Sequence, residues 1–191
     1  MQEQYPQIEL SINTGNDKQN AAIEHVLDSC GVELVVSNTL QAAGVTEPAI
    51  LTLLITSDDA IRDLNRQYRQ QDKATDVLSF PLLDKPLVNA PVDQLWMTPE
   101  GEEEEQAAQE GSRPVFITPP ELPTNLGDIV ISWPIVLRQA SEAGHSPTYE
   151  LLYLISHGVL HLIGYDDQSE AGYSAMVNIQ QSVLEAMGQK A

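Results

Sequence analysis

The chain has 191 residues, of which 42% are hydrophobic, so it can build one sizeable core and most simply forms one domain. Its formal net charge of −19 argues against broad binding to nucleic acid, which depends on Lys and Arg displacing counterions from phosphates. A single cysteine excludes an intramolecular disulfide, and the lack of a secretory signal or of ~18 consecutive apolar residues predicts a soluble, cytoplasmic protein with no membrane partner.

The amino-terminal part predicts a strand followed by two helices. Residues 8–12, IELSI, alternate apolar and polar side chains as a half-buried strand does. Turn and capping residues at 13–17 precede a helical region of about 20–30, and the apolar segment 32–43 predicts a second helix.

A strand-then-helix unit follows. Residues 49–56, AILTLLIT, form a short apolar run that is typical of a strand buried on both faces. Ser57 or Asp58 then caps a predicted helix that runs to about Arg69.

Two further strands flank a long acidic segment. Residues 77–80 and 126–133 each predict a strand that a following proline stops. Between them, residues 84–125 hold nine acidic side chains, two basic ones and seven of the twelve prolines. Such a stretch cannot bury enough apolar surface to offset its ordering entropy, so we expect a mobile insertion that joins two strands of one sheet. A solvated loop and an acidic segment that binds a partner both fit this composition.

The last third predicts three helices, at 135–143, at about 147–163, and in a final amphipathic segment that ends at Gly188. Across residues 1–191 the order of elements favours an α/β fold of the α+β type. We expect a single domain in which a small mixed four-stranded sheet packs with five to six helices, one of them a metal-binding helix like that of the zincins.

Two of the four histidines lie one turn apart on the predicted helix 147–163. His157 and His161 occupy positions i and i+4, so both imidazoles project from one face and can place two nitrogens ~2.0–2.1 Å from one zinc ion. Two core or surface histidines also occur at this spacing by chance.

The residues around the pair favour a catalytic zinc site. Gly164 ends the helix, so the chain can turn back and bring Asp166 or Asp167 to the ion as a third ligand, with a fourth position left open. Gly158 stands where the zinc-protease signature H-E-x-x-H carries its glutamate base, which disfavours ordinary zinc-protease chemistry.

Four of the nine basic residues fall within twelve positions, at Arg62, Arg66, Arg69 and Lys73. The three arginines share one face of the predicted helix, and a guanidinium fork suits phosphate oxygens. The stripe can therefore hold a phosphodiester despite the negative net charge. For Arg62 and Arg66 the alternative is pairing at helical spacing with the nearby acidic residues Asp58, Asp59 and Asp63.

Several motifs occur in the order of a known family. The motif HGVLHLIGYD at 157–166 is preceded by Tyr68-Arg69, Asp72-Lys73, TDVLSFP at 75–81 and LGDI at 126–129. Together they resemble the YbeY family of bacterial rRNA-maturation endoribonucleases, over roughly residues 45–83 and 126–175. The resemblance implies a single α/β domain with a small mixed sheet, a zinc held by three histidines in the pattern H-x3-H-x5-H, and metal-dependent cleavage of single-stranded RNA in 16S rRNA processing and ribosome quality control.

The family pattern carries over to His157 and His161 as ligands and to Arg69 as the functional arginine. The third ligand position falls on Asp167 instead of a histidine, and its negative charge would raise the pKa of a bound water relative to a neutral imidazole. Asp167-Gln168-Ser169-Glu170 also has the pattern of a capping-box-like helix start. Asp167 is therefore either the third ligand or a helix cap, with Asp166 the cap if Asp167 turns to the metal.

The function expected from these features is that of a zinc-dependent endoribonuclease, a hydrolase acting on the 16S rRNA precursor, with ribosomal small-subunit proteins as further partners. One zinc ion on the three ligands would polarise a phosphoryl oxygen or lower the pKa of a water, while Arg69 holds the phosphate. No residue is an obvious general base, so the attacking group stays open. Further candidate contacts to the ligands or the substrate are His145, which can equally be an ordinary loop histidine, and Lys73, Ser79 and Asp166.

Two alternatives belong to other functional classes. One is a non-catalytic ribosome-assembly factor with a structural metal, whose basic helix docks on RNA or on a ribosomal protein. The other is a metal-dependent hydrolase of a different substrate such as a peptide, which the glycine at position 158 disfavours.

Overall fold

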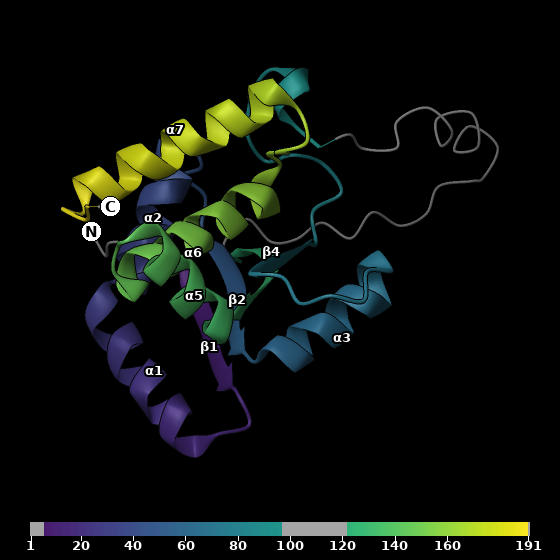
Figure 1. Ribbon diagram of the computed structural model, residues 1–191. Helices are drawn as coiled ribbons and strands as arrows, with labels where there is room; N and C mark the ends of the chain where they lie inside the picture. Colours follow the sequence, from purple (N-terminus) through teal and green to yellow (C-terminus); the bar gives the residue numbers. More distant parts are fainter. Residues whose placement is uncertain (1–5, 97–121, 191) are drawn as a thin grey trace.

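A four-stranded mixed sheet forms the centre of the computed structural model, which describes residues 6–96 and 122–190 (Figure 1). The strands are β1 (Gln7–Asn13), β2 (Ala49–Thr56), β3 (Val77–Pro81) and β4 (Thr124–Ser132), in the spatial order β1-β2-β4-β3. β1, β2 and β4 are parallel, and β3 runs antiparallel to β4 at one edge. The predicted mixed sheet is confirmed, as is the expectation that the segment between β3 and β4 joins two strands of one sheet.

Six α-helices accompany the sheet within the described ranges: α1 (Asp17–Cys30), α2 (Val32–Ala42), α3 (Asp58–Arg69), α5 (Trp133–Ala143), α6 (Pro147–Ile163) and α7 (Glu170–Ala186). A short 3-10 turn, η1 (Val92–Gln94), lies between β3 and β4 in the chain. The predicted helices are all present. α1 begins about three residues earlier than expected, because the side chain of Asn16 accepts hydrogen bonds from the backbone of Lys18 and Gln19 and so caps it.

The two faces of the sheet are covered unequally. The main core lies on the face that packs against α1, α2 and α6, and here the alternate β2 residues Leu51, Leu53 and Ile55 are at most 1% exposed. On the other face, Leu54 packs with Ile61 of α3 in a smaller cluster. The prediction that β2 is buried on both faces is therefore right for one face, while the residues on the face of α3 are only half-buried.

α6 is the central helix of the main core. It packs against β3 and β4 on one side and against α2, α5 and α7 elsewhere. A Cβ added at Gly158 would lie 2.9 Å from Cγ2 of Ile129 on β4. The helix and the sheet approach each other this closely because residue 158 has no side chain, which accounts for a glycine at this position in structural terms.

Residues 84–96 pack onto the folded domain. Val88 is buried in the main core, and the backbone N–H of Leu87 donates to the carbonyl of Ile163 at 2.9 Å. A Cβ added at Gly164, where φ is +126°, would lie 2.5 Å from Cβ of Pro86. The packing of residues 84–96 differs from the mobile insertion expected over 84–125. A few apolar residues in the acidic stretch make contacts with the domain, and the average composition of the stretch does not predict them. Residues 97–121 of that expected insertion lie outside the described residues.

No helix within residues 6–96 and 122–190 has both the length and the apolar character needed to cross a membrane.

Candidate metal centre

α6 and the turn after it bring three donor atoms together. Nε2 of His157 lies 3.0 Å from Nε2 of His161. Oδ2 of Asp167 lies 3.6 Å from the first of these atoms and 3.7 Å from the second. Among the residues that the structure describes, these three form the group of side chains able to hold a metal ion.

These distances fit a small divalent cation. Ligand atoms bound tetrahedrally at ~2.0–2.2 Å are separated from one another by about 3.3 Å, and the three measured separations lie on either side of that value. Three atoms that carry lone pairs repel one another at this range unless a proton or a cation lies among them. Two imidazole nitrogens and one carboxylate oxygen form a donor set that suits zinc.

The hydrogen bond made by Nδ1 of His161 determines where the lone pair of its Nε2 points. Nδ1 of His161 lies 3.0 Å from the carbonyl oxygen of Tyr165, which can only accept a hydrogen bond. Nδ1 therefore carries the ring proton of the neutral imidazole, and Nε2 keeps its lone pair on the side of Asp167.

The environment favours the charge states that a metal needs. Burial lowers the pKa of His157, and the neighbouring His161 lowers it further, so the ring tends to be neutral. The pKa of Asp167 is lowered chiefly by the side chain of His161, whose Nε2 lies 3.7 Å from the carboxylate, and this favours the ionised form. A neutral imidazole and an ionised carboxylate are the metal-binding forms of these groups.

Asp167 is not the cap of the last helix. α7 begins after Ser169, whose hydroxyl accepts the N–H of Gly172 at 2.9 Å. The carboxylate of Asp166 accepts from the N–H of Gln168 at 3.2 Å, within the turn, and caps no helix. The alternatives that placed an aspartate at the cap are therefore wrong, and the side chain of Asp167 remains available to the two histidines.

A segment that sequence reasoning missed supports this turn. Trp96 donates its indole N–H to the carbonyl of His161 at 3.1 Å, and the N–H of Asp166 donates to the carbonyl of Gln94 at 3.0 Å. Leu95 forms an isolated β-bridge with Tyr165. The signal in the sequence was limited to two apolar residues, Leu95 and Trp96, within the acidic stretch assigned to a mobile insertion.

The arginines of α3 differ in their pairing. Arg66 pairs with Asp63 at 2.7 Å, as expected for helical spacing, whereas Arg62 pairs at 2.8 Å with Asp72 beyond the helix. The predicted pairing at helical spacing is thus confirmed for Arg66, whereas the helical partners predicted for Arg62 are wrong. Arg69 is exposed and makes no ion pair with any described residue. α3 packs on the face of the sheet opposite to α6, and no contact joins Arg69 to the histidines within the described ranges.

The remaining candidates lie in different places. His145 precedes α6, and its Nε2 lies 3.0 Å from Oε2 of Glu150 in a nearly buried contact, which places the ring away from the three ligands. Lys73 is exposed beyond α3. Ser79 pairs with Ile129 across β3 and β4, and its buried hydroxyl has no hydrogen-bond partner in the described structure.

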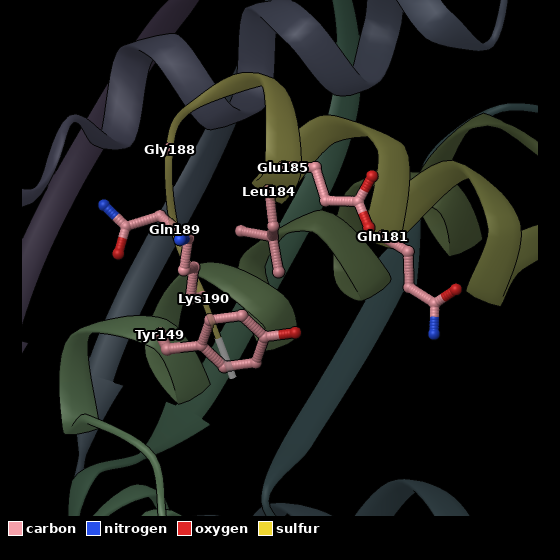
Figure 2. Close-up of a pocket in the computed structure, with 7 residues that line it drawn as sticks. All are labelled: Tyr149, Gln181, Leu184, Glu185, Gly188, Gln189 and Lys190. Carbon is pink, nitrogen blue, oxygen red and sulfur yellow. The ribbon is translucent and has the colours of Figure 1, made fainter.

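An open groove of about 560 Å³ lies between the start of α6 and the end of the chain (Figure 2). Its lining residue on α6 is at the opposite end of that helix from the histidines. It is lined by Tyr149 from the first turn of α6 and by Gln181, Leu184, Glu185, Gly188, Gln189 and Lys190 from the end of the chain. None of the three ligands lines it, so the groove and the candidate metal centre are separate features.

Comparisons with known proteins agree with the motifs. The family model described as Endoribonuclease YbeY matches residues 11–188. Endoribonuclease YbeY of Roseiflexus sp. (strain RS-1) is 37% identical over 163 residues, which is 85% of each chain. Endoribonuclease YbeY of Desulforamulus reducens is 40% identical over 159 residues, which is 82% of this chain and 84% of the relative.

A more distant likeness is the solution structure of TM1509 from Thermotoga maritima, which covers 93% of this chain and 91% of its own, with a TM-score of 0.46 and 22% identity. The family assignment rests on the family model and the curated relatives, which match most of the chain. The chain belongs to the endoribonuclease YbeY family.

Proposed function

We propose that this protein is a zinc-dependent endoribonuclease that cleaves single-stranded RNA and acts in the cytoplasm, in maturation of the 16S rRNA 3′ end and in ribosome quality control. Membership of the family supports the reaction class. The observation that carries the proposal for this chain is the convergence of His157, His161 and Asp167, whose donor atoms lie within 3.7 Å of one another.

The three side chains are accessible from solvent. Those of His157 and His161 are 19% and 22% exposed, and that of Asp167 is 38% exposed. An RNA strand can therefore approach the donor atoms without opening the core. A bound metal would supply a Lewis acid for a phosphoryl oxygen and would lower the pKa of a water.

The side chains of this protein have two roles in the proposed reaction, which are to bind the metal and to bind the RNA phosphates. His157 and His161 would hold the ion through their Nε2 atoms, and Asp167 would add one negative charge that the three-histidine pattern of the family lacks. Arg69 and Lys73 are exposed cations that form no ion pair within residues 6–96 and 122–190, so we assign to them the RNA backbone phosphates. Local cations of this kind are needed because the whole chain carries a formal net charge of −19.

The test compares cleavage and metal content in the same preparations. Wild-type protein loaded with zinc is incubated with a labelled single-stranded RNA that spans the 16S 3′ end and with the same sequence as a duplex. We expect cleavage of the single strand, loss of both cleavage and zinc in His157→Ala, and at least about a tenfold slower reaction with unchanged zinc in Arg69→Ala. Asp166→Asn, which keeps the oxygen that accepts within the turn, is the matched control.

Wild-type protein that binds zinc and RNA but leaves the RNA intact would overturn the proposal. That result would instead support the non-catalytic assembly factor, because the protein would bind metal and RNA without catalysing a reaction. Ribosomal small-subunit proteins are proposed partners under either outcome, and pull-down with purified 30S subunits tests them.

A further inference from the structure

The two histidines of the metal centre differ at their second ring nitrogen. His161 has an acceptor there, the carbonyl oxygen of Tyr165 at 3.0 Å. His157 uses its Nε2 for the contacts with His161 and Asp167, and within the described residues its Nδ1 makes no hydrogen bond. Metal-binding histidines almost always donate this second N–H to an acceptor, which fixes the ring orientation.

Gln180 of α7 supplies an unused acceptor at this level of α6. Its side chain is fully buried, and its Nε2 donates to the carbonyl oxygen of Tyr153 at 3.3 Å. A backbone carbonyl can only accept, so this contact determines which end of the amide faces Tyr153. Oε1 of Gln180 is thereby left buried with no hydrogen-bond partner in the described structure, which costs free energy unless a donor reaches it.

His157 lies over this position. Tyr153 and His157 are i and i+4 on α6, and helical side chains lean toward the amino terminus, so the ring of His157 extends over the turn on which Gln180 is anchored. The Gln180 side chain also acts on the pKa of His157. Burial and then His161 lower this pKa, whereas Gln180 acts to raise it.

The hydroxyl of Tyr153 is a second group near the same amide. Burial raises the pKa of the Tyr153 phenol, and a side-chain hydrogen bond with Gln180 acts to lower it. The side chain of Tyr153 is only half-buried, however, so its hydroxyl can bond to water instead. The His157 N–H has greater need of a protein acceptor, because its ring is more deeply buried and its other nitrogen faces the metal ligands.

We propose that Gln180 is a positioning residue of the metal centre, whose Oε1 accepts the Nδ1–H of His157 and so directs the Nε2 lone pair of that ring at the ion. The inference rests on the proposed metal site and adds a residue that binds neither metal nor RNA. This bond satisfies both the buried amide oxygen of Gln180, which has no other partner in the described structure, and the second ring nitrogen of His157.

Four variants separate this role from packing. Gln180→Met keeps the length and bulk of the side chain but removes the acceptor, and Gln180→Glu keeps an acceptor oxygen. Tyr153→Phe removes the rival donor. Val183→Ala, on the same helix and 3% exposed, loosens the core without touching a polar group. Circular dichroism and urea unfolding establish that each variant is folded.

Zinc affinity is the first measurement, by competition with a chromophoric chelator. We expect Gln180→Met to weaken zinc binding about 10–100-fold, Gln180→Glu to recover most of that loss, and both Tyr153→Phe and Val183→Ala to stay within about twofold of wild type. The inference is overturned if Gln180→Met binds zinc as wild type does, or if Val183→Ala weakens binding equally. It is also overturned if Tyr153→Phe reproduces the loss.

The ring tautomer of His157 is the second measurement, by long-range nitrogen–proton NMR on the metal-free protein. We expect the Nδ1–H tautomer to dominate in wild type and to lose that dominance in Gln180→Met. A wild-type protein that binds no zinc would defeat the proposed function, while the tautomer of the metal-free protein would still decide the role of Gln180. An unchanged tautomer in Gln180→Met would contradict the inference even if zinc binds normally.

Discussion

The Nδ1 atom of His161 and the carbonyl oxygen of Tyr165 are 3.0 Å apart, across the glycine that ends α6. One hydrogen bond therefore links the second histidine to the turn that carries Asp167. This bond couples the orientation of the His161 ring to the path of the turn. Substitutions that alter the turn should therefore change the affinity for the metal.

The first prediction concerns the third ligand. Replacing Asp167 by Ala removes one of three donor atoms and should weaken zinc binding by at least about tenfold, whereas Asp167→His restores a third imidazole and should retain the ion. Zinc content after dialysis against a chelator measures both. Asp166→Asn is the control, and an Asp167→Ala protein that keeps its zinc would remove Asp167 from the ligand set.

A second prediction follows from the packing of Gly158. Alanine favours a helix over glycine by roughly 1 kcal/mol, but a Cβ 2.9–3.1 Å from three atoms of the fully buried Ile129 overpacks the core at a cost of roughly 1–3 kcal/mol. We expect Gly158→Ala to lower the free energy of unfolding by about 1 kcal/mol, as measured by urea denaturation.

The matched background for that substitution is Ile129→Ala, which is itself destabilising but removes the clash. There Gly158→Ala should become neutral or stabilising, because the helix propensity of alanine remains and the obstacle is gone. Equal destabilisation in both backgrounds would show that Ile129 is not what excludes a side chain at position 158.

The third prediction compares two arginines on one helix. Arg69 forms no ion pair within the described parts of the chain, whereas Arg66 pairs with Asp63 at 2.7 Å. We expect Arg69→Ala to weaken binding to single-stranded RNA and to reduce the slope of log affinity against log salt by about 0.7, the value for one phosphate contact. Arg66→Ala should change the slope much less, because part of its charge is already compensated. Fluorescence anisotropy at several salt concentrations measures both, and equal slopes for the two variants would refute the assignment.

A fourth prediction uses the single cysteine. Burial raises the pKa of the Cys30 thiol to about 11 from 9.0. The native protein should therefore react very slowly with a thiol reagent at pH 8 and rapidly once unfolded in urea. Rapid reaction of the native protein would mean that Cys30 is not held in the core.

The same shift predicts the sign of a pH effect on stability. Between pH 9 and about 11 the unfolded thiol is ionised while the folded one still holds its proton. The folded state then binds more protons, so raising the pH through this window lowers the free energy of unfolding, by up to roughly 1.4 kcal/mol per unit. The difference between wild type and Cys30→Ala isolates this contribution from that of the tyrosines.

The sequence by itself determined the features that depend on local geometry. The order of strands and helices follows from the spacing of apolar residues, and the start of α6 from Ser146 followed by Pro147, whose roles as cap and first residue are confirmed. His157 and His161 meet because positions i and i+4 of any α-helix share a face.

Only the tertiary structure decided how the turn after α6 runs. The residue types allowed Asp166 or Asp167 to face the histidines, and either to cap the next helix. Contacts from Gln94 and Leu95, about seventy residues earlier in the chain, hold the turn so that Asp167 faces inward and Ser169 becomes the cap.

The physical reason is that these contacts join segments far apart in sequence, so no local pattern reports them. The composition of residues 84–125 predicted a mobile insertion, yet Val88 is buried in the core and Trp96 donates a hydrogen bond to α6. Arg62 likewise pairs with Asp72 instead of a neighbour on its own helix, because the chain folds back after α3. Periodicity and capping are properties of a few adjacent residues, whereas packing is a property of the whole chain.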